Sequence, residues 1–140
     1  MRHAATQERR IVGQQYPSRR VLVVDDNPDA AELVAQLLAL QGHEVVFTCS
    51  GAEALAAADQ LDPEVVFLDI SMPDLDGYQV ASALRRSGRF PLTRIVALTA
   101  WGNTKAREWS TATGFDAHII KPACAELLYS EAMRGRSLVT

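Results

Sequence analysis

The sequence has few cysteines and no long apolar run, and each scarcity excludes a class of protein. Its only two cysteines, Cys49 and Cys124, have no metal-ligand spacing, which argues against a zinc site or a disulfide framework. We expect both to be small, buried apolar residues. The longest apolar runs are strand-sized, so no transmembrane span is predicted, and residues 1–6 lack the apolar stretch of a secretory signal. These absences predict a cytoplasmic protein without direct membrane insertion.

Charge is divided unevenly along the chain. Residues 21–133 hold seven Lys or Arg against sixteen Asp or Glu, whereas residues 1–20 hold five Arg against one glutamate. An acidic body lacks the positive surface that phosphates need, so we expect no nucleic acid among its partners. A length of 140 residues fits one domain. We predict a flexible arm or linker over residues 1–18 and a single domain over residues 19–137.

The apolar pattern predicts five strands that alternate with five helices. Continuous apolar, β-branched runs indicate strands that are covered on both faces, as in a parallel sheet. Asn27-Pro28 is typical of a helix start, and Gly42 of a helix end. The expected strands are residues 21–24, 44–48, 64–69, 94–99 and 117–121. The expected helices are residues 28–41, 50–60, 76–87 and 104–113. A last helix is expected after Pro122 and contains Cys124, Leu127, Leu128 and Met133. This order predicts an α/β fold, a doubly wound parallel sheet with strand order 2-1-3-4-5.

Chemically reactive side chains stand at the ends of four of the five predicted strands. They are Asp25 and Asp26 at the end of the first strand, Asp69 at the end of the third, Thr99 at the end of the fourth and Lys121 at the end of the fifth. In a parallel sheet these positions share one edge, where ligands bind. Each residue alone has a structural explanation, such as turn formation or helix capping for the aspartates, but five together favour a site.

The residue types at this edge predict phosphoryl chemistry. Carboxylates held together repel unless a cation joins them, and hard oxygen ligands suit Mg²⁺. Asp69 lies between the other groups in the predicted sheet and can act as a nucleophile towards phosphorus. The Thr99 hydroxyl and the Lys121 ammonium would then stabilise the phosphoryl oxygens, together with the metal.

Four segments of the chain resemble the receiver domain of two-component response regulators, over roughly residues 20–133. They are VLVVDDNP at 21–28, FLDISMPDLDG at 67–77, ALTA at 97–100 and IIKP at 119–122. The resemblance implies a flavodoxin-like fold and a phosphorelay domain in which Asp69 accepts a phosphoryl group from a phosphohistidine. It also implies that Mg²⁺, with Mn²⁺ as an alternative, is bound by Asp26, Asp69 and the backbone carbonyl of Ser71, while Asp25 acts through water.

The resemblance extends to partners and to the phosphoryl contacts. It implies that Thr99 and Lys121 contact the phosphoryl group and that the Lys121–Pro122 bond is cis. The implied donor is a histidine kinase or a histidine phosphotransfer protein, and a homodimer formed on phosphorylation is a further partner that it allows. The segment GFDAHIIKP at 114–122 is most similar to receivers fused to hybrid histidine kinases.

One position departs from the pattern of the family, and three others are expected to affect the lifetime of the phosphoryl group. The family couples Thr99 to an aromatic residue on the fifth strand, and here His118 stands at that position. Because histidine titrates near neutrality, we hypothesise pH-sensitive activation; an exposed strand histidine without such a role is the alternative. The resemblance implies that Ser71, Ala100 and Trp101 occupy positions that gate water at the site. We hypothesise that the Trp101 indole covers the site and slows phosphoryl hydrolysis; packing of the indole on the surface is the alternative.

The surface that reports phosphorylation is predicted to comprise residues 104–113, the fifth strand and the last helix. Residues 104–113 have few apolar side chains to hold them rigid, and such segments shift easily between conformations.

The preferred function is a signalling receiver, which catalyses its own phosphorylation and dephosphorylation but is not an enzyme that releases a product from a separate substrate. Three other functions are possible. An aspartate-nucleophile phosphatase usually needs a second aspartate two residues after the first, where this chain has Ser71. A docking domain that has lost phosphorylation would not need all five site residues. A dinucleotide-binding domain would need Gly-x-Gly-x-x-Gly after the first strand, which is missing. We expect no output domain after the last helix, so that the chain is either a stand-alone receiver or a piece of a hybrid histidine kinase.

Overall fold

Five parallel strands form the centre of the computed structural model, which describes residues 18–100 and 114–135. The sheet order is β2-β1-β3-β4-β5, as predicted from the sequence. The strands are β1 (Arg20–Val24), β2 (Glu44–Thr48), β3 (Val65–Asp69), β4 (Arg94–Thr99) and β5 (Ala117–Ile120). Because all pairings are parallel, the carboxyl ends of the strands meet at one edge of the sheet.

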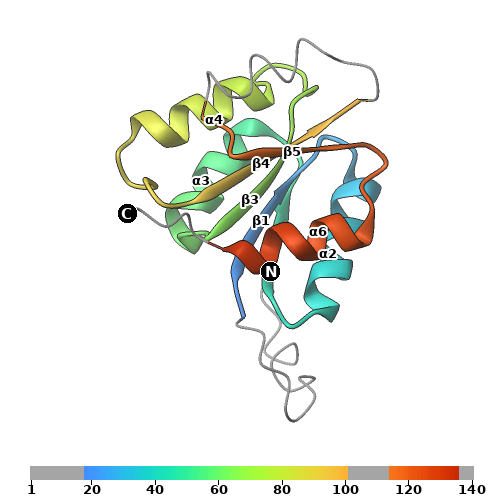
Figure 1. Cartoon of the computed structure of the whole chain (residues 1–140). Helices are drawn as coiled ribbons and strands as arrows, with labels where there is room; N and C mark the ends of the chain where they lie inside the picture. The colour runs from blue at the N-terminus through green and yellow to red at the C-terminus, as the bar shows by residue number, and fades with distance from the viewer. Residues whose placement is uncertain (1–17, 101–113, 136–140) are drawn as a thin grey trace.

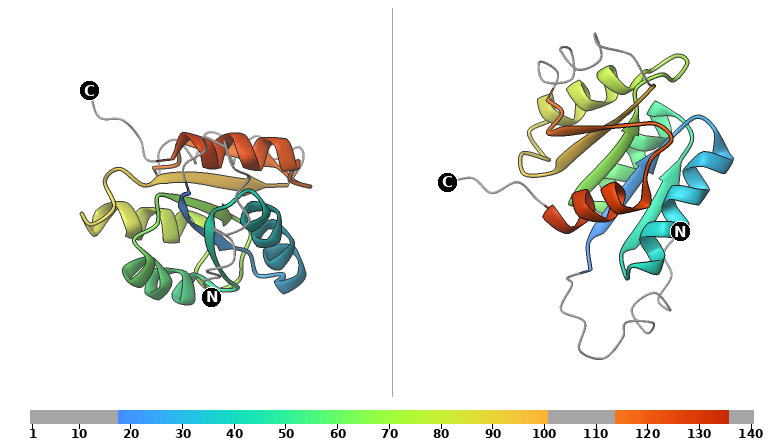
Figure 2. Two further views of the ribbon diagram at one scale, coloured as in Figure 1. Left: turned by 90° about the horizontal axis from the view of Figure 1, so that it is seen from below. Right: turned by 45° about the vertical axis from the view of Figure 1, so that its right-hand side comes forward.

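Helices cover both faces of the sheet (Figures 1 and 2). On one face lie α3 (Gly51–Leu61) and α4 (Gly77–Arg86), and on the other α2 (Pro28–Leu40) and α6 (Ala125–Arg134) lie side by side. These are the four helices of the described residues. The helix predicted over residues 104–113 and almost all of the predicted arm lie outside the part of the chain that the structure describes.

The core consists of two apolar layers, one on each face of the sheet. Side chains alternate between the faces along each strand, so that Leu22 and Val24 pack beneath α3 and α4 whereas Val21 and Val23 pack beneath α2. Every residue of β3 is buried. Full burial of one such aliphatic side chain contributes about 1.5–3 kcal/mol, which fixes the strands and thereby the loops at their ends.

Local sequence signals set the starts of three helices at the carboxyl edge. Asn27 accepts hydrogen bonds from the backbone N–H groups of Asp29 and Ala30, and Ser50 caps α3 in the same way. Asp76 and Gln79 form a capping box at α4, each side chain accepting from the backbone N–H of the other residue. These caps turn the chain sharply after β1, β2 and β3.

Both cysteine predictions are wrong. Cys124 is exposed and Cys49 is only partly buried. Cys124 occupies the N-cap position of α6 and Cys49 lies in the turn between β2 and α3, so neither side chain belongs to the core layers.

Among the described helices, none is long and apolar enough to cross a membrane.

Candidate functional site

The first carboxylates of the site follow β1 directly. Asp25 is buried, with 2% of its surface exposed, whereas Asp26 is exposed. The backbone N–H of Asp25 donates to the carbonyl of Thr48 at 3.2 Å, and its Oδ1 accepts from the backbone N–H of Asn27 at 3.0 Å. The residue that caps α2 therefore also orients Asp25, a role that sequence reasoning had not assigned to Asn27.

Asp69 is the last residue of β3 and is equally buried, with 3% of its surface exposed. Its Oδ1 accepts from the backbone N–H of Ser71 at 3.0 Å. The loop that follows folds back closely, because a Cβ at Gly77 would lie 2.5 Å from the Cα of Ile70 and 2.6 Å from the carbonyl oxygen of Asp69. Glycine at this position lets α4 begin directly against the end of β3.

Lys121 follows β5 and lies between two of these carboxylates. Its Nζ is 3.0 Å from Oδ2 of Asp25 and 3.3 Å from Oδ2 of Asp69. Its backbone N–H donates to the carbonyl of Thr99 at 2.7 Å, which ties the ends of β5 and β4 together. The Lys121–Pro122 peptide bond is cis, as predicted.

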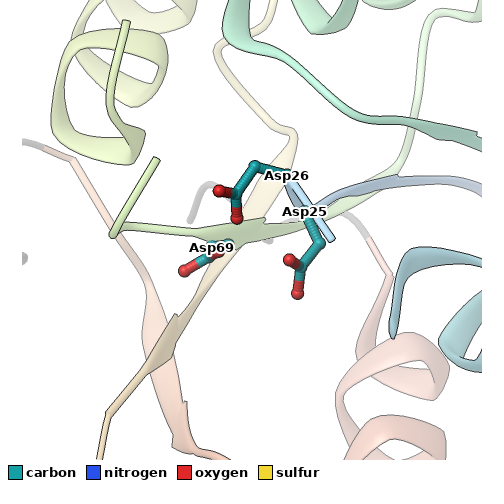
Figure 3. Close-up of side chains that lie close together, drawn as sticks. All are labelled: Asp25, Asp26 and Asp69. Carbon is teal, nitrogen blue, oxygen red and sulfur yellow. The ribbon is translucent and has the colours of Figure 1, made fainter. Parts of the chain in front are cut away.

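Three carboxylates meet at this edge. Figure 3 shows Asp25 and Asp26 at the end of β1 gathered with Asp69 at the end of β3. One carboxylate oxygen from each lies within 4.8 Å of the others. This spacing and an all-oxygen donor set fit a hard divalent cation such as Mg²⁺, which takes a few carboxylates and keeps several waters. Asp26, as the exposed member, leaves the cluster open to solvent.

The electrostatics of the cluster favour a cation. Burial, together with the nearby charge of Asp25, raises the pKa of Asp69 to about 6, although the Ser71 N–H and the Lys121 ammonium act in the opposite direction. Burial lowers the pKa of Lys121, but its bond to Asp25 and the charge of Asp69 outweigh this and leave the pKa above its usual value. Lys121 therefore stays charged and only partly offsets the repulsion between the buried carboxylates.

A groove extends from the carboxylates along α2. Besides Asp25, Asp26, Asp69 and Lys121 it is lined by Asn27, Ala30, Leu33, Val34, Leu37, Ser71, Leu98, Ala100, Pro122 and Ala123. The apolar side of this groove was not predicted. Its one sequence signal is the spacing of Leu33 and Leu37, which places them on a helix stripe beside the buried Val34.

The structure thus brings most of the predicted site residues together. Ser71 and Ala100 line the groove, whereas Thr99 is buried at the end of β4 and is not among the lining residues. His118 is half-buried on β5, and its neighbours Ala117 and Ile119 pack towards α2 and α6, so that His118 points to the opposite face. Trp101 lies outside the described residues.

Comparison with protein families matches residues 21–132 to the response regulator receiver domain. Among curated proteins, the chain is 36% identical over 104 residues to the probable transcriptional regulator ycf27 of Cyanophora paradoxa, covering 74% of this chain and 42% of that protein. It is 33% identical over 103 residues to the DNA-binding dual master transcriptional regulator RpaA of Synechocystis, covering 74% and 43%. The chain therefore spans less than half the length of these relatives.

Solved structures agree with these relatives. Chemotaxis protein CheY4 of Vibrio cholerae superposes with a TM-score of 0.79 at 28% identity, covering 85% of this chain and 99% of that one. NtrX of Brucella abortus, solved with ADP, gives a TM-score of 0.78 at 32% identity, covering 84% of this chain and 27% of that one.

The prediction that nucleic acid is not a partner is contradicted by these relatives, since the Synechocystis protein is a DNA-binding regulator. The argument failed because it considered only the charge of residues 21–133, whereas the DNA-binding relative extends well beyond the 43% of its length that matches this chain. The similarity to receivers of hybrid histidine kinases stays a prediction.

Proposed function

Because the chain belongs to the response regulator receiver domain family, we propose that it accepts a phosphoryl group on Asp69 from a phosphohistidine of a histidine kinase or histidine phosphotransfer protein. The observation that carries this proposal is the convergence of three carboxylates within 4.8 Å with the Lys121 ammonium between two of them. This set of groups suits the transfer of a doubly charged group to a carboxylate.

In the proposed transfer, an oxygen of Asp69 forms a bond to phosphorus while the bond from phosphorus to the donor imidazole nitrogen breaks. The product is an acyl phosphate on Asp69, and attack by water later releases inorganic phosphate and restores the carboxylate. Asp25, Asp26, Asp69 and the backbone carbonyl of Ser71 would hold Mg²⁺, which supplies charge neutralisation for the phosphoryl oxygens.

Other groups orient the carboxylates or neutralise charge on the phosphoryl group. The Ser71 N–H holds the Asp69 carboxylate in one orientation, and Asn27 does the same for Asp25. Lys121, whose ammonium now bridges Asp25 and Asp69, would turn one of its donors to a phosphoryl oxygen. Ser71 and Ala100, at the wall of the groove, would limit the approach of the hydrolytic water.

We further infer that phosphorylation changes the surface that contains β5 and α6. The hydroxyl of Thr99 would move towards the phosphoryl group, and His118 would change its rotamer in response. The backbone bond between Lys121 and Thr99 supports this coupling, because it joins the ends of β4 and β5 next to the site. The chain would act as a signalling domain that catalyses its own phosphorylation and dephosphorylation.

Intact-mass measurement after incubation with acetyl phosphate and Mg²⁺ tests the proposal. We expect a gain of one phosphate that a chelator prevents and that Asp69→Asn abolishes. The matched control is Asp74→Asn, which removes an exposed carboxylate from the same loop outside the cluster and should leave the adduct intact. No adduct on the folded wild-type chain would favour a docking domain, and an adduct on Asp69→Asn would mean that another residue is the acceptor.

A further inference from the structure

The outer edge of β2 has no neighbouring strand among the described residues, because β2 lies at the end of the sheet and pairs only with β1. The N–H of Glu44 and the carbonyl of Thr48 form hydrogen bonds with residues at either end of β1. Backbone groups of successive strand residues point to opposite sides, so those of Val45 and Phe47 point away from β1. Within the part of the chain that the structure describes, they have no backbone partner. An extended segment could pair with them.

A hollow lies along this edge, between β2 and α3. Its side on α3 consists of residues spaced by three and four positions, next to the stripe that packs in the core. Because two of these residues are alanines, the helix leaves room for side chains from outside. A second hollow shares Ala57 and Gln60 and continues towards the start of β2. The first hollow is lined by Phe47, Thr48, Cys49, Glu53, Ala56, Ala57 and Gln60.

The described chain begins next to the start of β2. Ser18 Oγ donates to the carbonyl of Gly42 at 2.8 Å, and the N–H of Arg19 donates to Nδ1 of His43 at 3.0 Å. Residues 1–17, which hold three arginines and one glutamate, therefore join the domain at this end of β2. We call them the basic arm. Two strand spacings of about 4.8 Å separate β1 from the outer side of β2, a distance that roughly three extended residues cover.

The basic arm contains one segment suited to this edge. Arg9 and Arg10 precede Ile11-Val12, the only isoleucine and valine of the arm, and Pro17, a residue typical of turns, separates this segment from β1. An arm that turns at the start of β2 and follows its outer edge runs antiparallel to it. Ile11-Val12 then reaches the hollow, and the two arginines reach the carboxyl end of the strand.

The carboxyl end of β2 is negatively charged. Glu53 is exposed there and forms no ion pair within the described residues. Burial, and then the charges of Glu53, Asp25 and Asp26, raise the pKa of the Cys49 thiol at the end of the strand. The same field attracts a guanidinium group.

We propose that the basic arm binds the outer edge of β2 of its own chain as an antiparallel strand, with Ile11-Val12 beside the hollow and the two arginines beside Glu53. Hydrogen bonds to Val45 and Phe47 hold its backbone, and the apolar pair covers the surface between β2 and α3. Attraction to Glu53 sets the direction of the arm. This binding is independent of phosphoryl transfer. It also brings positive charge towards the side of the carboxylate cluster.

Disulfide formation in the full chain tests the position of the basic arm. In a Cys124→Ser background at low protein concentration, Arg10→Cys should form an intramolecular disulfide with Cys49, which the antiparallel arrangement places beside it. The comparison is Arg2→Cys, which extends beyond the end of β2. An unbound arm would close the two loops at rates within about 1.3-fold of each other, because loop-closure entropy changes slowly with length. We expect Arg10→Cys to react at least about 10-fold faster, measured by peptide mass after mild oxidation.

Hydrogen exchange tests the pairing with β2. The amides of Val45 and Phe47 should exchange about 10-fold faster or more in Val12→Asp than in wild type, because the variant places a carboxylate in an apolar contact beside Glu53. Ala5→Asp adds the same charge outside the paired segment and should change nothing. The amides of β3, which is fully buried, report global unfolding and should exchange equally in all three chains.

Three results would overturn the proposal. One is an equal rate of disulfide formation in Arg10→Cys and Arg2→Cys, and another is exchange at Val45 and Phe47 that Val12→Asp leaves unchanged. The third is a disulfide between two copies as the main product, because it would assign the outer edge of β2 to the arm of another copy.

Discussion

Lys121 and Asp25, 96 residues apart in the chain, are joined by a hydrogen bond of 3.0 Å between Nζ and Oδ2. The same ammonium lies 3.3 Å from Oδ2 of Asp69. Lys121 therefore offsets the charge of the same carboxylates that a metal ion would bind, beside the oxygen to which the proposed phosphoryl group would be attached. Any ligand of this site competes with, or redirects, this ammonium.

The substitution Lys121→Gln separates the effect of Lys121 on metal binding from its effect on phosphoryl transfer. Removal of the positive charge should tighten Mg²⁺ binding, by about 10-fold for a change of roughly 1.4 kcal/mol in electrostatic free energy. The same substitution should slow phosphorylation by acetyl phosphate by at least about 10-fold, because a donor to the phosphoryl oxygens is lost. Titration with Mg²⁺ and the rate of the mass change measure the two effects. Weaker Mg²⁺ binding in Lys121→Gln would contradict the proposed neutralising role.

Mg²⁺ should stabilise the folded chain through the three carboxylates. A ligand that binds only the folded state at ten times its dissociation constant adds about 1.4 kcal/mol to the free energy of unfolding. We expect the melting temperature to rise with Mg²⁺ and to respond little in Asp26→Asn. Asp29→Asn is the matched control, because Asp29 is exposed in the next helix and lies outside the cluster. An equal response in wild type and Asp26→Asn would exclude Asp26 as a ligand.

Asp69→Asn should stabilise the metal-free chain at neutral pH. The pKa of Asp69 is raised from 3.8 to about 6, chiefly by burial, so that keeping this group ionised in the folded state costs about 1–3 kcal/mol at pH 7. Between about pH 4 and pH 6 the folded chain holds a proton on Asp69 that the unfolded chain has released. The contribution of Asp69 to the free energy of unfolding therefore falls as the pH rises across that range.

Melting temperatures measured in a chelator from pH 4 to pH 7 test this sign. The advantage of Asp69→Asn over wild type should be small near pH 4, grow up to about pH 6 and then level off. Mg²⁺ at pH 7 should narrow the difference, since it neutralises the carboxylate of the wild type. An advantage that is as large at pH 4 as at pH 7 would show that ionisation of Asp69 is not its cause.

The sheet and the position of the site could be predicted from the sequence because each rests on local patterns. The run Val21–Val24 is continuous and apolar, so it had to be a covered strand, and Asn27-Pro28 fixed the helix that follows. Once the strand order was given, Asp69 had to lie beside Asp25 at the carboxyl edge.

What could not be predicted depends on long-range geometry. The choice of Asp25 as the hydrogen-bond partner of Lys121 follows from side-chain reach across the sheet, which no spacing encodes. Cys124 was misjudged because a small apolar residue beside a helix has the same sequence signature in the core and at an N-cap. The exposure of Leu40 and Leu127 was missed because the helical period places them next to buried positions.

Gly77→Ala should damage both the fold and the metal site. The added Cβ would lie 2.5 Å from the Cα of Ile70 and 2.6 Å from the carbonyl oxygen of Asp69, and both obstacles are backbone atoms that cannot rotate away. We expect a loss of about 1–3 kcal/mol in the free energy of unfolding, measured by urea denaturation. Because relief of the contact requires movement of the backbone at Asp69, the affinity for Mg²⁺ should fall as well.

Gly88→Asn is the matched control: Gly88 has φ +74°, a conformation that asparagine tolerates, and a Cβ there meets nothing within 4 Å. That variant should remain within about 1 kcal/mol of wild type and bind Mg²⁺ normally. A Gly77→Ala chain as stable as Gly88→Asn would mean that α4 can move away from β3 without cost, and that glycine at this position does not shape the site.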